Sequence, residues 1–211
     1  MLTFVFHMSR LLQERSSGIQ ELMKMVGVSL NTLGICHFLN VLPIGLIFAA
    51  GGALVCKVTS RPLLPQTDGF LIFLMLLLYF NSVIALAFAC SYISRGTQYA
   101  VTLSALTYAI SWVPARYLST RKLKYSLKML TGLLPHVPMN WFWSTLGPLE
   151  VTGRGANFRN ITEKLSANDY PPVIYIFGFM LLQSLICYVL AWYLSLVRPG
   201  QYGQALPWNF L

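Results

Sequence analysis

Four long stretches of the chain contain no charged residue. They are Met25–Cys56 with 32 residues, Gly69–Ser94 with 26, Gly96–Ala115 with 20 and Tyr170–Val197 with 28. A helix needs about 20 apolar residues to cross a hydrocarbon core about 30 Å thick. The pattern therefore predicts four membrane-spanning helices, over about residues 33–56, 70–93, 99–115 and 172–197.

The segment before the first predicted span has a different pattern. Between Ser9 and Val28, apolar residues recur every three or four positions among charged ones. This spacing predicts an amphipathic helix on the membrane surface, interrupted near Ser16–Gly18. Residues 1–8 are apolar but would reach only about 12 Å as a helix, so we expect the end of a truncated span.

The segment between the third and fourth spans, residues 116–171, does not have the pattern of a further span. Its charge-free part is interrupted at Gly132, Pro135, Pro138, Gly147 and Pro148. Proline inside a helix costs roughly 3 kcal/mol, so we expect the third span to stop at Pro114 and two short helices to follow. These helices, Ser119–Leu134 and Met139–Leu146, are predicted to form a re-entrant or interfacial hairpin.

Composition supports this membrane assignment. The 211 residues are 56% hydrophobic and 10% charged, with a mean hydropathy of +0.61, which excludes a soluble globular domain. The net charge of +9 does not indicate nucleic-acid binding, because the basic residues lie in the connections between apolar stretches. The four cysteines have no metal-knuckle or redox spacing, so no metal site is expected.

A few polar residues interrupt the predicted spans. They are His37 and Asn40 in the first span, Asn81 in the second and Gln183 in the last. Such groups either hydrogen bond to a neighbouring helix or line a substrate path, and the sequence leaves both roles open. The small residues of Ala49–Ala53 are expected to admit a neighbouring helix closely.

Two features of the sequence disagree about orientation. If the spans alternate sides, the side that holds the long 116–171 connection carries ten basic residues and the opposite side five. The excess favours a cytoplasmic location for that connection. The glycosylation sequon Asn160-Ile161-Thr162 favours an extracellular or lumenal one. Charge alone therefore leaves the orientation open.

Both ends of the chain resemble a known family. The tail contains Pro199-Gly200-Gln201-Tyr202-Gly203, followed by Pro207-Trp208-Asn209-Phe210. It resembles the signature that follows the last span of each half of the A-subfamily ABC transporters, just before a nucleotide-binding domain. Glu14-Arg15 and the segment Ile19–Val28 are similar to the charged elbow that leads into the second half of the same membrane domain.

The resemblance implies an all-α polytopic helix bundle, the transmembrane domain of an ABC exporter. It implies that 1–8 ends a truncated span, that 9–30 is a cytoplasmic elbow and that 31–197 is the transmembrane domain. Within that domain, 116–171 would lie outside and Asn160 would be glycosylated. The tail, 198–211, would be cytoplasmic and lead to a missing nucleotide-binding domain. Glu14, Glu21 and Lys24 would couple the elbow to that domain.

The family function would be ATP-driven lipid transport across or out of a plasma or organelle membrane. The sequence has no Gly-rich phosphate loop followed by Lys and Ser or Thr, so ATP and Mg are expected only on nucleotide-binding domains elsewhere. Expected partners are membrane lipids, those domains and the other transmembrane half. A stand-alone scaffold or channel is the alternative. A membrane enzyme using His37 with Asn40, or His136, is less supported because no carboxylate lies within either span.

Overall fold

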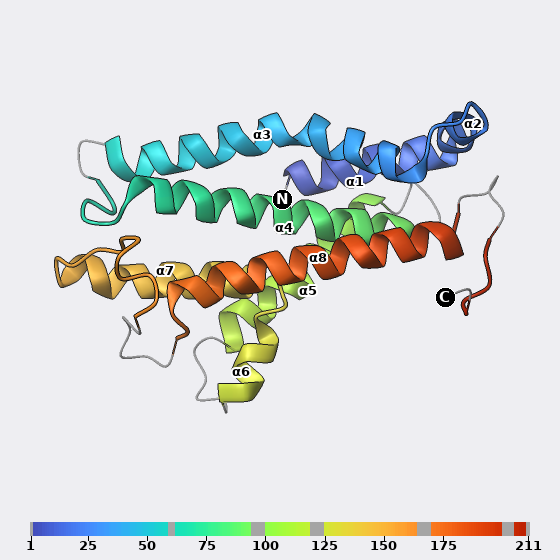
Figure 1. The fold of residues 1–211 in the computed structure, drawn as a ribbon. Helices are drawn as coiled ribbons and strands as arrows, with labels where there is room; N and C mark the ends of the chain where they lie inside the picture. The colour runs from blue at the N-terminus through green and yellow to red at the C-terminus, as the bar shows by residue number, and fades with distance from the viewer. Residues whose placement is uncertain are drawn as a thin grey trace. The chain divides into compact units, whose positions relative to one another are not determined.

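A computed structural model describes residues 2–58, 62–93, 100–118, 125–163, 170–199 and 205–209. Across these residues the secondary structure is helical, with loops and no strand, which confirms the predicted all-α class. The helices, shown in Figure 1, are α1 (Leu2–Ser16), α2 (Ile19–Met25), α3 (Leu30–Val58), α4 (Gly69–Ile93), α5 (Ala100–Leu118), α6 (Tyr125–Thr131), α7 (His136–Val151) and α8 (Val173–Val197).

Three of these helices are long and apolar enough to cross a membrane. They are α3 over Asn31–Val58, with 28 residues, and α4 and α8, with 25 residues each. Their lengths exceed the roughly 20 residues that a hydrocarbon core requires. Helix α5 has 19 residues and is not among the three, so a fourth span stays a prediction.

The chain folds into two compact units. Unit 1 contains residues 1–43, 83–109 and 184–211, and unit 2 contains residues 44–82 and 110–183. The long helices α3, α4 and α8 each contribute one part to each unit, because the unit boundaries fall within them.

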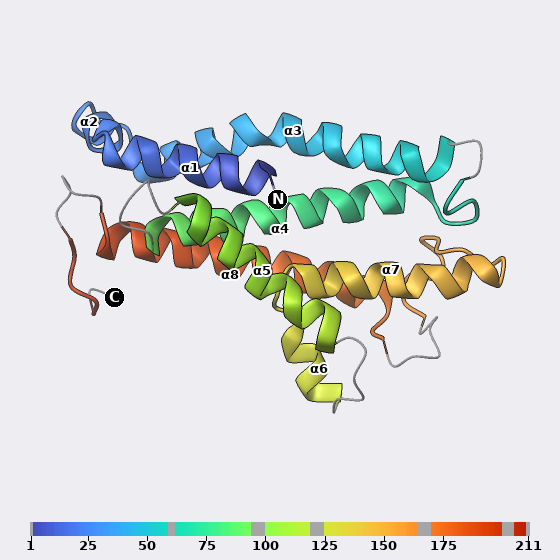
Figure 2. The ribbon, with the colours of Figure 1, turned by 180° about the vertical axis from the view of Figure 1, so that it is seen from behind.

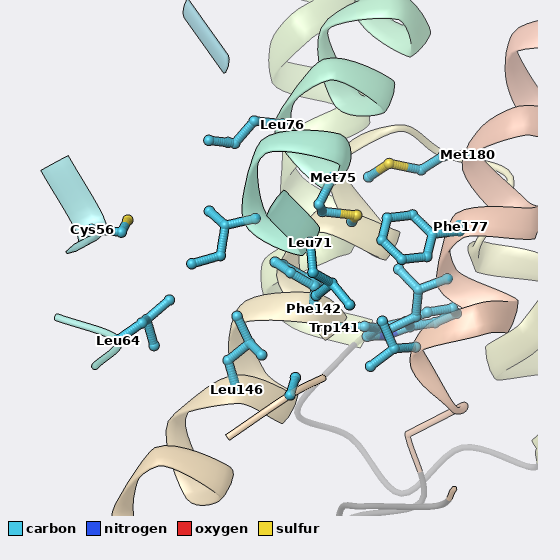
Figure 3. Close-up of a cluster of buried hydrophobic side chains, with 14 of the residues drawn as sticks. Cys56, Leu64, Leu71, Met75, Leu76, Trp141, Phe142, Leu146, Phe177 and Met180 are labelled. Atoms are coloured by element: carbon cyan, nitrogen blue, oxygen red, sulfur yellow. The ribbon is translucent and has the colours of Figure 1, made fainter. Parts of the chain in front are cut away.

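The apolar core of unit 2 forms where α7 packs against α4 and α8. Trp141 and Phe142 of α7 are fully buried, together with Met75 of α4 and Met180 of α8. Figure 3 shows these side chains pointing toward one another. Burying side chains of this size stabilises by about 1.5–3 kcal/mol each, so α7 is held by this face.

Close packing between α3 and α4 confirms the prediction for the small residues near position 50. Ala49 is fully buried in the core cluster. Gly52 faces Leu76, where a Cβ would lie 2.6 Å from a Leu76 methyl carbon, and a Cβ on Gly45 would lie 2.5 Å from Phe80 Cδ1. Small side chains at these positions let the two helix backbones approach closely.

Helix α1 anchors the N-terminal part of unit 1. Figure 2 shows it alongside the first part of α3. The Phe4 ring contacts Tyr108 of α5, and the His7 ring contacts Phe88 of α4 at 5.0 Å between centroids. The helix runs unbroken across the expected boundary between residues 8 and 9, because its buried face continues through Leu11 and Leu12. The predicted interruption near Gly18 is present, with φ +75° at that glycine.

The hairpin differs from the prediction in its helix limits. Helix α7 extends from His136 to Val151, well beyond the predicted Met139–Leu146. Pro138 lies in its first turn, where the missing N–H has no intrahelical partner to lose. Pro148 is tolerated because buried side chains on both sides of it, Leu146 and Leu149, hold the helix.

Helix α5 likewise continues past Pro114 to Leu118, so the expected stop there is wrong. Several other predicted features lie outside the described residues. They are the turn at 94–99, the start of the first hairpin helix at 119–124, the loop at 164–169 and the Gly200–Gln204 part of the tail.

Candidate functional site: the elbow and the polar groups of the helices

Glu14, predicted as a coupling residue, lies on the last turn of α1. Its Oε1 accepts a hydrogen bond from Arg10 Nε at 3.3 Å, and its Oε2 lies 3.0 Å from His37 Nε2. His37, on the first turns of α3, was expected only as a polar group of a span. The structure thus joins two residues that the sequence analysis assigned to separate roles, and the pair ties the elbow to the first long helix.

The short helix α2 carries the other two predicted coupling residues. Lys24 Nζ donates to Glu21 Oε1 at 2.7 Å, and both side chains are partly exposed. Beside this pair, Leu22, Met25 and Val26 expose 58%, 80% and 78% of their surface. A mixed charged and apolar exposed face is typical of a surface that contacts another protein or a membrane.

The remaining polar residues of the long helices differ in their surroundings. Asn40 is exposed on α3, one turn beyond His37. Gln183 of α8 is buried, and its Oε1 accepts a hydrogen bond from the Ser82 hydroxyl of α4. The neighbouring Asn81 is partly buried. Gln183 therefore hydrogen bonds to a neighbouring helix, and the roles of Asn40, Asn81 and Gln183 in a substrate path stay predictions.

The sequence analysis missed a polar connection made by Glu150, at the end of α7. Its carboxylate accepts hydrogen bonds from the backbone N–H of Gln66 at 3.0 Å and of Thr67 at 2.7 Å. Burial alone would raise the pKa of Glu150, but hydrogen bonds from the Thr67 hydroxyl and from these amides hold it below its ordinary value. The carboxylate therefore stays ionised and fixes the 65–68 loop to α7.

The sequence signal for Glu150 was its position. It is the single acidic residue between Arg116 and Ala156, and it follows a long charge-free stretch. A carboxylate at such a boundary needs a partner, which in this fold is a loop 83 residues earlier.

The sequon residue Asn160 takes part in a compact turn. Its Nδ2 donates to the Gly155 carbonyl at 2.9 Å, and its Oδ1 accepts from the Asn157 N–H at 2.8 Å. Gly155 has φ +57° and packs against the Gln66 backbone. Asn160 is therefore part of the same loop assembly as Glu150, and its glycosylation stays a prediction.

The length and apolar composition of α3, α4 and α8 define a multi-pass membrane protein. No family model matches the chain. It is 29% identical over 205 residues to the glucosylceramide transporter ABCA12 of Mus musculus, covering 95% of this chain and 8% of that protein. It is 30% identical to the mouse ATP-binding cassette sub-family A member 7 over 200 residues, covering 94% of this chain and 9% of the relative.

A third relative is the phospholipid-transporting ATPase ABCA3 of Homo sapiens, with 26% identity over 203 residues, 94% of this chain and 12% of that protein. These matches confirm the resemblance to the A-subfamily ABC transporters. The chain spans about a tenth of the length of these curated relatives and corresponds to one segment of them.

Proposed function

We propose that this chain forms membrane helices of an ATP-driven transporter that moves lipids across or out of a membrane. Nucleotide-binding domains elsewhere would supply ATP hydrolysis. The observation that carries the proposal is similarity over 95% of the chain to proteins named as transporters of glucosylceramide and, over 94%, of phospholipid. The proposed arrangement includes α5 as a fourth span.

Exposed apolar surface on the long helices supports a lipid environment and a lipid cargo. Helix α3 exposes Ile47 at 74% and Leu54 at 59%, and α8 exposes Leu185 at 61%. Faces of this kind match acyl chains, whereas an ion path would need polar or charged lining groups. A stand-alone channel is correspondingly less supported.

The proposal places the elbow and the tail in the cytoplasm and residues 116–171 outside. In that orientation, Glu14, Glu21 and Lys24 face the nucleotide-binding domains, and Asn160 is accessible to glycosylation. The count of basic residues favours the opposite orientation, but it depends on the long 116–171 connection. An excess of basic residues sets topology chiefly through short loops close to the span ends.

A chimera tests the proposed transport function. The matched segment of the mouse glucosylceramide transporter is replaced by this chain, and the purified chimera is reconstituted in vesicles with fluorescent glucosylceramide or phospholipid. We expect lipid movement that requires hydrolysable ATP and stops with a non-hydrolysable analogue. A correctly inserted chimera that hydrolyses ATP but moves neither lipid would contradict the proposal and favour a scaffold role.

The coupling role of α2 is tested in the same chimera by Glu21→Ala. We expect substrate-stimulated ATP turnover to fall about three- to tenfold with normal expression, because a charge at a domain interface sets register between moving parts. Glu163→Ala is the matched control, since Glu163 is an exposed carboxylate in the loop after α7. Equal stimulation in the two variants would show that the Glu21–Lys24 pair is only a solvated surface pair.

A further inference from the structure

Arg15, on the last turn of α1, connects the ends of two long helices. Its Nη1 donates to the Ser91 carbonyl at 2.6 Å, and its Nη2 donates to the Arg198 carbonyl at 2.8 Å. Ser91 lies in the last turn of α4, and Arg198 directly follows α8. Carbonyls at helix C-termini have no intrahelical donor, so one guanidinium satisfies groups that each helix by itself leaves unpaired.

The Arg15 guanidinium is fixed by a second contact. Its Cζ lies 4.4 Å from the centroid of the Tyr92 ring. Tyr92 also forms a side-chain hydrogen bond with Gln20, which is a buried residue of α2. The Tyr92 side chain therefore meets both helices of the elbow. Lysine could not reproduce this geometry, because it lacks the planar fork that donates in two directions and stacks on a ring.

Arg198 extends the connection into the tail. Its guanidinium Cζ lies 5.5 Å from the centroid of the Trp208 ring. The Tyr193 hydroxyl donates to the Trp208 carbonyl at 2.7 Å, and the Leu206 N–H donates to the Leu196 carbonyl at 3.1 Å. The described part of the tail, residues 205–209, is therefore folded back along the end of α8.

We infer that Arg15 is a positioning residue that locks the folded-back tail to the elbow. Arg15 holds the backbone of Arg198, and the Arg198 side chain holds Trp208, so elbow, α4 and tail move as one body. Release of the tail loosens α2, and displacement of the elbow loosens the tail, because energetic coupling between two sites is reciprocal. Only the consequence for transport rests on the proposed function.

Hydrogen exchange on the purified chain in nanodiscs tests the lock directly. In Arg15→Lys, we expect the Leu206 amide to exchange about tenfold faster, the effect of losing one charged hydrogen bond. Exchange in the middle of α4 should stay unchanged. Arg10→Lys is the matched control, since Arg10 lies on the same helix and contacts Glu14 instead. Equal Leu206 exchange in both variants would overturn the inference.

A second variant tests reciprocity without altering Arg15. Trp208→Leu removes the tail side of the connection, and we expect exchange in α2 to rise about fivefold. Trp112→Leu replaces another exposed tryptophan, on α5, and should leave α2 unchanged. If Trp208→Leu affects only the tail, the tail is a local fold and the coupling does not exist.

The consequence for transport is measured in the chimera. Arg15→Lys is expected to keep basal ATP turnover and to lose about threefold or more of the stimulation by lipid, because elbow and tail no longer move together. If Arg15→Lys changes hydrogen exchange but leaves the stimulation of ATP turnover by lipid intact, the lock exists but has no role in transport. A chimera without any lipid transport would contradict the proposed function, and the exchange results would still decide the lock.

Discussion

Gly155→Ala is expected to lower the midpoint of thermal unfolding by about 10 °C, from a loss of about 3 kcal/mol at about 2–4 °C per kcal/mol. Gly155 has φ +57°, which costs an L-residue about 1–2 kcal/mol. An added Cβ would also overlap the Gln66 carbonyl, and this backbone cannot yield without moving the loop that Glu150 holds. The measurement is a melting curve of the purified chain in detergent.

Gly153→Ala is the matched control for this prediction. Gly153 has φ +70°, two residues earlier in the same loop, but nothing lies within 4 Å of an added Cβ. It should therefore show only the backbone cost, about 2–8 °C. Equal losses in the two variants would show that the contact between Gly155 and Gln66 does not contribute to stability.

Gly45→Ala is expected to destabilise the packing of α3 on α4 by about 2 kcal/mol, or about 4–8 °C. The new Cβ would lie 2.5 Å from Phe80 Cδ1, and Phe80 also contacts the Phe48 ring, which limits its retreat. Gly51→Ala, on the same helix with nothing within 4 Å of its Cβ, should be neutral or slightly stabilising.

A compensating substitution separates packing from backbone effects at Gly45. Gly45→Ala combined with Phe80→Leu should be more stable than the sum of the two single losses, because the smaller side chain makes room for the methyl group. Additive losses in the double variant would mean that the two residues do not share the helix contact.

Local pattern was sufficient for several features of the fold. The charge-free stretches predicted the three long helices, and Gly18 indicated the break between α1 and α2. The expected boundary between residues 8 and 9 was wrong, since α1 is one helix, and two further errors were at prolines. Pro114 and Pro148 lie inside helices whose ends the sequence placed earlier. At Pro148, the packing of the buried neighbours Leu146 and Leu149 outweighs the loss of one backbone hydrogen bond.

The coupling role of Glu14, Glu21 and Lys24 stays a prediction, and only part of their pairing could be read from the sequence. Glu14 and Glu21 were recognisable from the elbow motif, and the pairing of Glu21 with Lys24 follows from helical spacing. The contact between Glu14 and His37 requires α1 and α3 to pack together, which no local spacing encodes.

By itself, the sequence determined the membrane class, the long helices and the family resemblance, because each depends on local hydrophobicity or on a contiguous motif. The tertiary structure decided which distant polar groups meet. Arg15 reaches carbonyls 76 and 183 residues away, and Glu150 holds amides more than 80 residues earlier. A buried or helix-terminal polar group needs a partner from whichever segment packs beside it, and that segment is chosen by the apolar faces of the helices.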